Sequence, residues 1–190
     1  MKPLVVALTA RRAGPNDAAA YRALRIAAAE SSPVAFADDI ERLRESTVAD
    51  WDRALVNDDI EDNPAWFVLD DSRQLVGTAM VVRQHGLKYS NAARIHEMYI
   101  MPSWRGNGGA DLLLHSIFAW VRAREVLTLT LVVAADNAAA VRAYLRAGFL
   151  ISGIDRDAIR WDDRYIDQLR MYRRVQGATT SGAPSGKGES

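Results

Sequence analysis

The hydrophobic and polar residues of this chain fall into periodic stretches that predict both strands and helices. Short runs of apolar and β-branched residues indicate strands, whereas apolar residues recurring three or four positions apart indicate amphipathic helices. Strands are expected at 4–8, 65–70, 75–84, 93–101, 126–134, 149–161 and 164–175, and a loop at 9–14. Helices are expected from a cap at 16 or 17 to 30, over 36–55 with a break at 46 or 47, over 109–124, and from a cap at 136 or 137 to 147.

The order of these elements determines the fold class that we expect. One strand, two helices, three strands, a helix, a strand, a helix and two strands make neither a pure βαβ alternation nor an all-antiparallel chain. The prediction is therefore an α/β fold of the mixed α+β kind, with a mixed sheet and helices on both faces. The unit spanning 95–133 should be a right-handed parallel crossover. Strand 126–134 is apolar along most of its length, which predicts burial on both faces.

Length and composition limit the classes of function. The 190 residues fit one domain, 1–175, followed by a tail, 176–190, whose Gly, Ser, Thr, Pro and Lys content predicts disorder. Lys plus Arg and Asp plus Glu number 24 each, so no overall field recruits nucleic acid or an anionic membrane. No apolar run reaches membrane-spanning length, and the apolar start is short for a signal peptide, so the cytoplasm is the expected compartment.

The residue types that are missing also restrict the chemistry. The chain contains no cysteine, which excludes disulfides, thiolate metal sites and an acyl-cysteine intermediate. No spacing of His, Asp and Glu residues suggests a metal site, so no metal is expected. Any acyl transfer by this protein should therefore proceed by direct attack on the acyl donor.

The loop before the helix at 109–124 carries the clearest candidate chemistry. Its glycines remove the Cβ atoms that would keep a ligand from the backbone, and the helix presents unpaired N–H groups and the positive end of its dipole. These features predict a site for a phosphate or another anion. A P-loop is excluded because no Lys-Ser/Thr pair ends the loop, and a dinucleotide fingerprint because its sixth position is Asp111. The loop reads Arg105-Gly106-Asn107-Gly108-Gly109-Ala110.

Two segments resemble the motifs of the GNAT family of N-acetyltransferases. The loop 105–110 fits Arg-x-x-Gly-x-Ala and resembles the family's pyrophosphate loop, Arg/Gln-x-x-Gly-x-Gly/Ala. The segment 137–149 resembles the family's Asn-x-x-Ala-x-x-x-Tyr-x-x-x-Gly-Phe, with Asn137 and Tyr144 at the matching positions. The element order is also that of the family. Softer similarities in the opening helices and the closing hairpin extend the resemblance to about 4–175.

The resemblance implies acetyl-CoA as the co-substrate, with its diphosphate on the backbone N–H groups of the loop. The pantetheine arm would lie between strands 93–101 and 126–134, which splay apart in this family and so free backbone groups. A backbone N–H of Tyr99 or Met98 would polarise the thioester carbonyl and hold the developing oxyanion. The residues implied in binding acetyl-CoA are Met98, Tyr99, Ile100, Arg105, Gly106, Asn107, Gly108, Gly109, Ala110 and Asn137.

The resemblance also implies the catalytic residues. A primary amine is mostly protonated at neutral pH and has to lose a proton before it attacks. His96 holds the strand position at which many family members carry a base, and strict alternation turns Glu97 to the opposite face. A β-bulge, common on this strand in the family, would reverse that choice in favour of Glu97. Proton removal through ordered water is a third alternative, and Tyr144 is the implied proton donor to the departing thiolate.

The implied function is acetyl-CoA-dependent N-acetyl transfer to a primary amine of a small molecule or peptide, by direct attack in a ternary complex. The alternatives are a protein acetyltransferase, acting on lysine or on an N-terminus, and a non-catalytic acetyl-CoA-binding module. The acceptor should be recognised by 33–63, 85–91 and 159–166, the least motif-like segments. Dimers are common in the family, which leaves a homodimer open.

Overall fold

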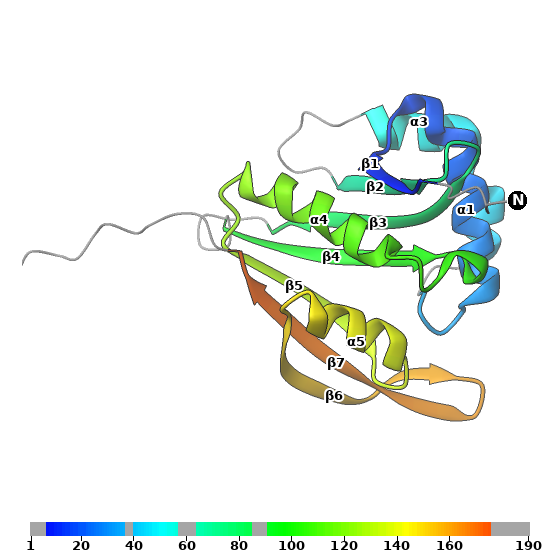
Figure 1. The fold of residues 1–190 in the computed structure, drawn as a ribbon. Helices are drawn as coiled ribbons and strands as arrows, with labels where there is room; N and C mark the ends of the chain where they lie inside the picture. Colours follow the sequence, from blue (N-terminus) through cyan, green and yellow to red (C-terminus); the bar gives the residue numbers. More distant parts are fainter. Residues whose placement is uncertain (1–6, 37–39, 57–63, 85–90, 176–190) are drawn as a thin grey trace, which may run out of the picture.

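The computed structural model describes residues 7–36, 40–56, 64–84 and 91–175 of the chain, and Figure 1 shows how they are arranged. The strands are β1 (Thr9–Arg12), β2 (Ala65–Asp70), β3 (Leu75–Arg83), β4 (Ala92–Ile100), β5 (Thr128–Ala134), β6 (Leu150–Trp161) and β7 (Arg164–Arg174). The α-helices are α1 (Ala18–Ser31), α2 (Ile40–Glu45), α3 (Val48–Val56), α4 (Gly109–Arg122) and α5 (Ala138–Arg146). Two 3₁₀ turns, η1 (Pro15–Asp17) and η2 (Pro102–Trp104), precede α1 and the glycine loop.

The strands form one mixed sheet in the order β1-β2-β3-β4-β5-β7-β6. Strands β1 to β4 are antiparallel neighbours, and β5, β7 and β6 form a second antiparallel set. The two sets are joined by β4 and β5, which run parallel and are connected through α4. The mixed sheet and the parallel crossover are therefore confirmed.

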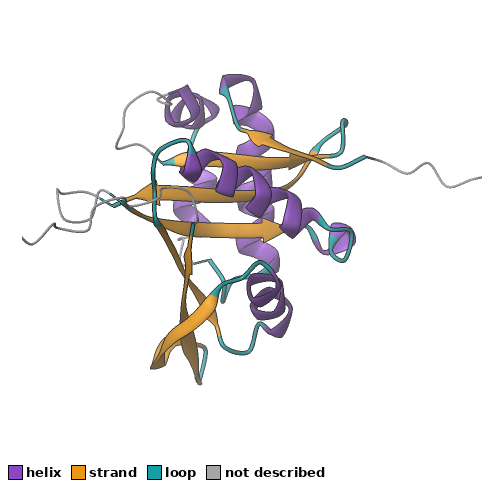
Figure 2. Cartoon of the chain, turned by 60° about the vertical axis from the view of Figure 1, so that its left-hand side comes forward, coloured by secondary structure: helices purple, strands orange, loops and turns teal. Residues whose placement is uncertain are grey.

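Helices cover both faces of the sheet, as predicted (Figure 2). On one face, α4 and α5 pack on the sheet and bury residues such as Leu113, Ile117 and Tyr144. On the other face, α1 and α3 bury Tyr21, Leu24 and other apolar side chains against the sheet. Tyr21, Leu24 and Ala28 recur three or four positions apart, which places them on one side of α1.

The first strand was predicted in the wrong place. Residues 4–6 lie outside the described residues, and the strand β1 occupies Thr9–Arg12, where a loop was expected. This strand is polar because it lies at the edge of the sheet and pairs with β2 alone. Its existence depends on that pairing, which the periodicity of apolar residues does not show.

The prediction that β5 is buried on both faces was also wrong. Leu129, Leu131 and Val133 are buried on the α4 and α5 side, whereas Val132 on the other side is 39% exposed. Among the described residues, the layer of α1 and α3 packs on β2, β3 and β4, and its buried cluster includes no residue of β5. The predicted tail, 176–190, and the loops at 57–63 and 85–90 lie outside the described residues.

The predicted break in the second helical region is confirmed between α2 and α3. Thr47 and Asp50 exchange hydrogen bonds there: the Thr47 N–H donates to Asp50 Oδ2 at 2.8 Å, and the Asp50 N–H donates to Thr47 Oγ1 at 3.2 Å. This reciprocal pair satisfies two of the donors that a helix start leaves unpaired, so α3 begins anew.

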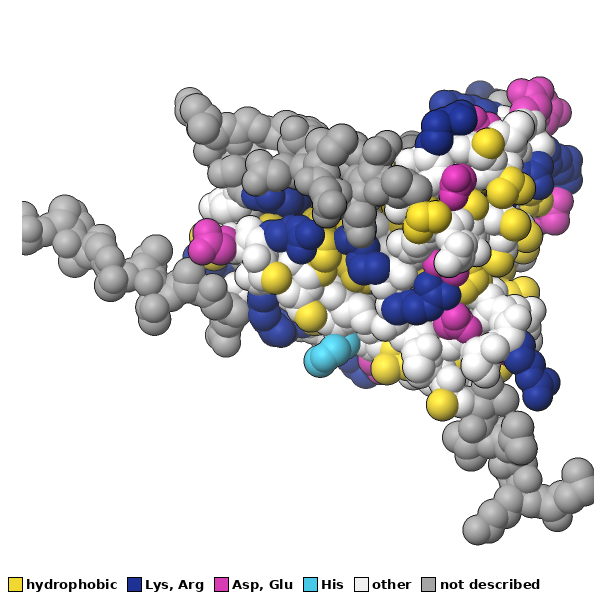
Figure 3. Space-filling view, turned by 90° about the horizontal axis from the view of Figure 1, so that it is seen from above, with side chains coloured by type: hydrophobic (Ala, Val, Ile, Leu, Met, Phe, Trp, Pro, Cys, Tyr) yellow, Lys and Arg dark blue, Asp and Glu magenta, His cyan; other side chains and the backbone are white. Residues whose placement is uncertain are grey.

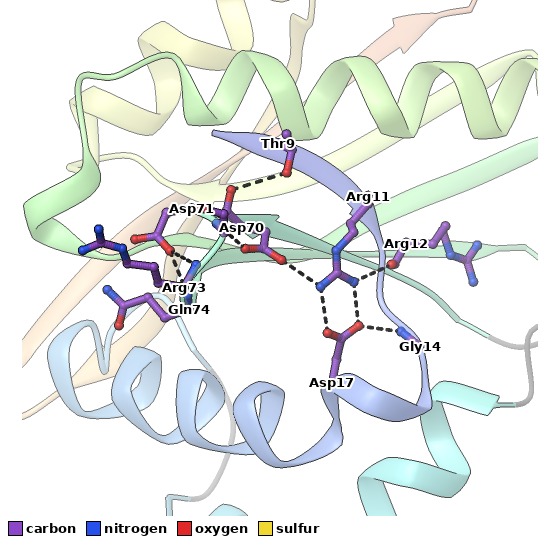
Figure 4. A network of polar contacts seen from close by, with 10 residues as sticks. Thr9, Arg11, Arg12, Gly14, Asp17, Asp70, Asp71, Arg73 and Gln74 are labelled. Carbon is purple, nitrogen blue, oxygen red and sulfur yellow. Dashed lines mark hydrogen bonds and ion pairs between the residues drawn. The ribbon is translucent and has the colours of Figure 1, made fainter. Parts of the chain in front are cut away.

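A network of polar contacts joins β1, the start of α1 and the end of β2 (Figure 4). The Arg11 guanidinium donates two hydrogen bonds to the Asp17 carboxylate, at 2.7 and 2.8 Å, and one to Asp70 at 2.9 Å. Asp17 also accepts from the Gly14 N–H at 2.8 Å, so its carboxylate closes the η1 turn and does not cap α1. Arg11 is partly exposed, so each ion pair contributes at most about 1 kcal/mol.

On the face seen in Figure 3, basic side chains gather left of the centre, and acidic and basic side chains lie interspersed on the right. No helix among the described residues is long and apolar enough to cross a membrane. The described residues also contain no group of three or more His, Cys, Asp or Glu side chains placed to hold a metal ion.

Replacing Tyr21 by Phe should destabilise the protein by about 1 to 2 kcal/mol. The Tyr21 and Thr78 hydroxyls are buried and lie 2.9 Å apart, so the change leaves the Thr78 hydroxyl without this partner. Chemical denaturation measures the difference. Tyr165→Phe is the control, because Tyr165 is 61% exposed; an equal loss in the two variants would contradict the expectation.

Candidate functional site

The glycine loop opens α4 with two residues in the left-handed region. Gly106 has φ +82° and Gly108, the N-cap residue, has φ +77°. No side chain caps the helix, and its backbone ladder begins with the Leu112 N–H donating to the Gly108 carbonyl at 3.1 Å. A Cβ on Gly106 or Gly108 would meet no atom within 4 Å, so the backbone faces open space. The start of α4 therefore presents backbone to open space, which is what an anion site at a helix N-terminus requires.

Gly109, the next residue, is required for a different reason. A Cβ there would lie 2.5 Å from Leu69 Cδ2 on β2 and 3.3 Å from Ile100 Cδ1 on β4. The first turn of α4 therefore lies close to the sheet, and a side chain at 109 would require the Leu69 side chain to move. Asn107 and Ala110 complete the loop, exposed and half-buried respectively.

The Arg105 side chain lies between the glycine loop and the end of β4. Its Nε donates a hydrogen bond to the Ile100 carbonyl at 3.0 Å, and its guanidinium carbon lies 6.0 Å from the centre of the Tyr99 ring. The side chain remains exposed. The arginine thus places a positive charge beside the open amides of the loop while holding the last carbonyl of the strand.

Strands β4 and β5 are hydrogen-bonded over only part of their length. The parallel pairing covers 92–94 on β4 and 128–130 on β5, and both strands then continue without pairing to each other. In Figure 1 they diverge toward the end at which α4 begins. We call this unpaired region the split. It lies where the sequence predicted a pantetheine arm between the two strands.

A β-bulge interrupts β4 within the split. Thr78 on β3 pairs with Tyr99, but Met80 pairs with His96, so β4 contains one residue more than β3. Glu97 lies in this interval with φ +55°, a left-handed conformation that is rare for a residue other than glycine. The β-bulge that the family resemblance raised as an alternative is therefore present.

The bulge determines which backbone groups of β4 face the split. The Met101 N–H donates to the Val76 carbonyl at 2.9 Å, so Met101 points its backbone toward β3. Antiparallel pairing alternates, which turns the N–H and C=O of Ile100 toward β5, those of Tyr99 back to β3, and those of Met98 toward β5 again. Of the two N–H groups that the sequence offered as candidates, that of Met98 points toward the split and that of Tyr99 points toward β3.

His96 and Glu97 both lie on the face of the sheet that α1 covers. The Thr78 hydroxyl contacts Tyr21 on α1, so Thr78 and Met80, two positions later, point to this face. His96 pairs with Met80 and shares its direction. Glu97 forms an ion pair with Arg25 of α1. The bulge thus places both candidate bases on the same face of the sheet. The direction of the side chains therefore does not distinguish His96 from Glu97 as the base.

The surroundings of the two candidate bases differ. Burial, and next the charge of Arg94, lower the pKa of His96, so this imidazole is neutral near pH 7. The Glu97 carboxylate is engaged with Arg25, whose side chain is 2% exposed and lies near the rings of Phe36 and Trp51. Of the two side chains, Glu97 is held in an ion pair, whereas His96 is a neutral imidazole.

Helix α5 carries the remaining predicted residues. Asn137 caps the helix, since its Oδ1 accepts from the Ala140 N–H at 3.2 Å, and it is exposed. Tyr144 is 7% exposed, with its ring edge-on to Phe149 at 5.8 Å. Burial raises the pKa of Tyr144 to about 12, so its hydroxyl stays protonated at neutral pH. No described residue makes a hydrogen bond to this hydroxyl.

Sequence analysis did not assign a role to three residues that border the bulge. Arg25 contacts Glu97, the Ser31 hydroxyl lies 2.8 Å from the Tyr99 hydroxyl, and the Phe36 ring lies edge-on to that of Tyr99 at 5.7 Å. One signal was available for Arg25. An arginine between Leu24 and the apolar residues that follow it, on the buried side of a helix, calls for a buried partner.

The comparisons with known proteins show the family and the fold of the chain. The sequence model of the family described as "Acetyltransferase (GNAT) family" matches residues 23–149. Comparison with curated protein sequences gives no match.

Among solved structures, the chain is similar to an acetyltransferase of the GNAT family from Streptococcus pneumoniae, with TM-score 0.78 and 22% identity over 90% of this chain and 100% of that one. It is similar to a candidate acetyltransferase from Salmonella typhimurium solved with its cofactor acetyl-CoA, with TM-score 0.70 and 17% identity over 93% and 99%. It is also similar to the ribosomal-protein-S18-alanine N-acetyltransferase from Escherichia coli, with TM-score 0.64 and 21% identity over 93% and 99%.

Replacing Gly108 by Ala should weaken coenzyme A binding at least tenfold, as measured by calorimetry. The added methyl group projects into the open space of the loop, and the left-handed backbone costs about 1 kcal/mol. Gly148→Ala is a matched control, because Gly148 also has a left-handed φ, +82°, but lies just after the C-terminal end of α5. It pays the same backbone cost and should leave the affinity unchanged; equal affinities in the two variants would rule out the loop as the anion site.

Proposed function

Because this chain belongs to the GNAT family of acetyltransferases, we propose that it is an N-acetyltransferase that moves an acetyl group from acetyl-CoA directly to a primary amine. The observation that carries the proposal is the junction of two features. The uncapped, glycine-lined start of α4 adjoins the end of β4 at which pairing with β5 has stopped. An anion site beside a row of free backbone groups suits a ligand with a diphosphate and an amide-containing arm.

The loop and the split supply the contacts that acetyl-CoA would need. The N–H groups of 106–110, with Arg105 beside them, would hold the diphosphate. Met98 and Ile100 direct backbone groups toward the split and would pair with the arm. Asn137 would contact the arm from α5 through its side-chain amide, since its Oδ1 already accepts a bond from the helix. No metal is part of this proposal.

The chemistry proposed is direct aminolysis of a thioester. The amine nitrogen attacks the carbonyl carbon, a C–N bond forms, the C–S bond breaks, and the amine proton passes to a base. The Met98 N–H would stabilise the negative charge that develops on the carbonyl oxygen. The absence of cysteine supports a direct route, because no thiol is present to carry the acetyl group.

Tyr144 would act on the departing sulfur mainly as a hydrogen-bond donor. Its pKa of about 12 is roughly 3 to 4 units above that of an ordinary thiol. Full proton transfer to a free thiolate would therefore be uphill by roughly 5 kcal/mol. Donation of a hydrogen bond while charge builds on the sulfur avoids this cost, and the proton can move later as the products separate.

His96 is the base that we propose for the amine. Its lowered pKa keeps it neutral and able to accept a proton at neutral pH. Glu97 stays the alternative, together with transfer through ordered water. We place the activity in the cytoplasm, within a domain of 1–175 followed by a tail of 176–190, and leave a homodimer open.

The proposed acceptor is a primary amine of a small molecule or peptide. A protein lysine or N-terminus and a non-catalytic acetyl-CoA-binding module are the alternatives. A protonated tyrosine and a neutral histidine on the elements that border the split favour an enzyme over a module. Parts of the segments expected to recognise the acceptor, 37–39, 57–63 and 85–90, lie outside the described residues.

A thiol-release assay with a panel of amines tests the proposed function. The wild-type protein should release coenzyme A only when a suitable amine is present, and Tyr144→Phe should lower kcat about 100-fold, the size expected for losing one hydrogen-bond donor to a developing charge. Its affinity for coenzyme A should stay within about threefold of wild type. Tyr165→Phe is the control with an exposed hydroxyl. Tight binding of coenzyme A without turnover of any amine or peptide would instead indicate a module.

The pH dependence of the reaction tests His96. Burial and the Arg94 charge lower its pKa, and protonated imidazole cannot accept a proton, so kcat/KM should fall as the pH drops below that pKa, which lies under 6.5. The amine titrates as well, so the profile is compared with that of His96→Gln. In that variant kcat/KM should be about 100-fold lower, and it should lack the fall at acidic pH that His96 causes in the wild-type protein. An unchanged profile in His96→Gln would exclude His96 as the base.

A further inference from the structure

The bulge on β4 holds a glutamate in a conformation that glutamate does not favour. Glu97 has φ +55°, whereas the glycine loop meets the same requirement with Gly106 and Gly108. A left-handed residue other than glycine persists only where its surroundings impose it. The contacts of Glu97 should therefore show what keeps the bulge in place.

Arg25 is the partner that reaches Glu97 from α1. The arginine is 2% exposed, and its guanidinium carbon lies 5.7 Å from the Phe36 ring centre and 6.0 Å from that of Trp51. A charged side chain enclosed in this way has little freedom to move, and it forms an ion pair with the Glu97 carboxylate. The pair therefore joins a fixed point on α1 to the bulged residue of β4.

A second contact reinforces the same region. The Tyr21 hydroxyl lies 2.9 Å from the Thr78 hydroxyl, and it also interacts with the side chains of Arg25 and Glu97. Thr78 is the β3 residue at which the register with β4 shifts. Buried groups from α1 thus contact both strands where the extra residue is accommodated.

The ion pair and the direction of the Met98 N–H depend on the same backbone geometry. If β4 ran without the bulge, strict alternation would turn the Glu97 side chain to the α4 face, away from Arg25. The N–H of Met98 would then point back to β3, and that of Tyr99 would face the split. Glu97 reaches Arg25 only in the arrangement in which Met98 faces the split.

We propose that Arg25 is a positioning residue that acts through Glu97: it holds the β4 bulge, and so aims the Met98 N–H at the carbonyl of the bound thioester. The inference rests on the proposed acetyl transfer for its effect on rate. It assigns Glu97 a role in backbone geometry and leaves proton removal to His96.

Glu97→Gly and Glu97→Ala form the pair of variants that tests this role. Both remove the carboxylate from Arg25 equally, but glycine adopts a left-handed φ freely and alanine does not. Glu97→Ala and Arg25→Met should each lower kcat about 30-fold, and Glu97→Gly should be at least tenfold faster than Glu97→Ala. The KM for acetyl-CoA should change less than about threefold in all of them, because the glycine loop is untouched.

The double variant Arg25→Met with Glu97→Gly checks that the arginine acts through the glutamate. It should be no slower than Glu97→Gly alone, since a glycine at 97 no longer needs the contact. Arg25→Lys, which keeps a charge, should recover part of the rate lost in Arg25→Met. If Glu97→Gly and Glu97→Ala are equally slow and both lose the acidic limb of the pH profile, Glu97 is the base and the proposal is wrong.

Amide hydrogen exchange over 95–100 follows the bulge without turnover. Exchange there should accelerate in Arg25→Met and in Glu97→Ala, and less so in Glu97→Gly, while β2 keeps its protection. If the wild-type protein acetylates no amine but the variants show this exchange pattern, the proposed function is refuted. The role of Arg25 in holding the β4 bulge is then still supported. Unchanged exchange and kcat in Arg25→Met, in an active protein, would overturn the inference.

Discussion

Hydrogen bonding between β4 and β5 stops after 94 and 130 although both strands continue. Backbone polar groups shielded from water need partners, so the groups of Met98 and Ile100 that face β5 need a partner other than a strand. Arg105 satisfies one of them through its bond to the Ile100 carbonyl. The interruption of the sheet thus leaves backbone groups with which the proposed amide-containing ligand would pair, and the glycine loop would bind its anionic end.

Left-handed backbone occurs both in the glycine loop and in the β4 bulge. The loop uses glycines at these positions, whereas the bulge uses a glutamate. In the loop, Gly106 and Gly108 face open space, and any side chain there would occupy room that a ligand needs. In the bulge, Glu97 faces the buried Arg25, so a side chain has a partner to meet. Glycine permits this conformation at low cost, whereas at Glu97 the proposed constraint is an ion pair to a buried arginine of another element.

The partial cover of the sheet is consistent with one position for the acceptor side of the proposed site. Helices α1 and α3 pack on β2, β3 and β4, while β5 leaves Val132 exposed on the same face. The split lies at the boundary between the covered and the uncovered half. His96 and Glu97 point to this face, beside the polar side chains of α1, which makes the boundary the side from which an amine would approach.

The sequence by itself determined the order of the elements, the mixed sheet, the glycine loop before α4 and the helix that carries Tyr144. These features depend on periodicity and on residues close together in the chain, where local sterics and helix ends decide the outcome. Tertiary structure alone decided the strand at Thr9–Arg12, the open face of β5 and the direction of the β4 backbone. The bulge adds one residue relative to a neighbouring strand, and the partner of Glu97 lies 72 residues away. The sequence of β4 does not reveal the extra residue or the partner of Glu97, because both depend on which elements pack against this strand.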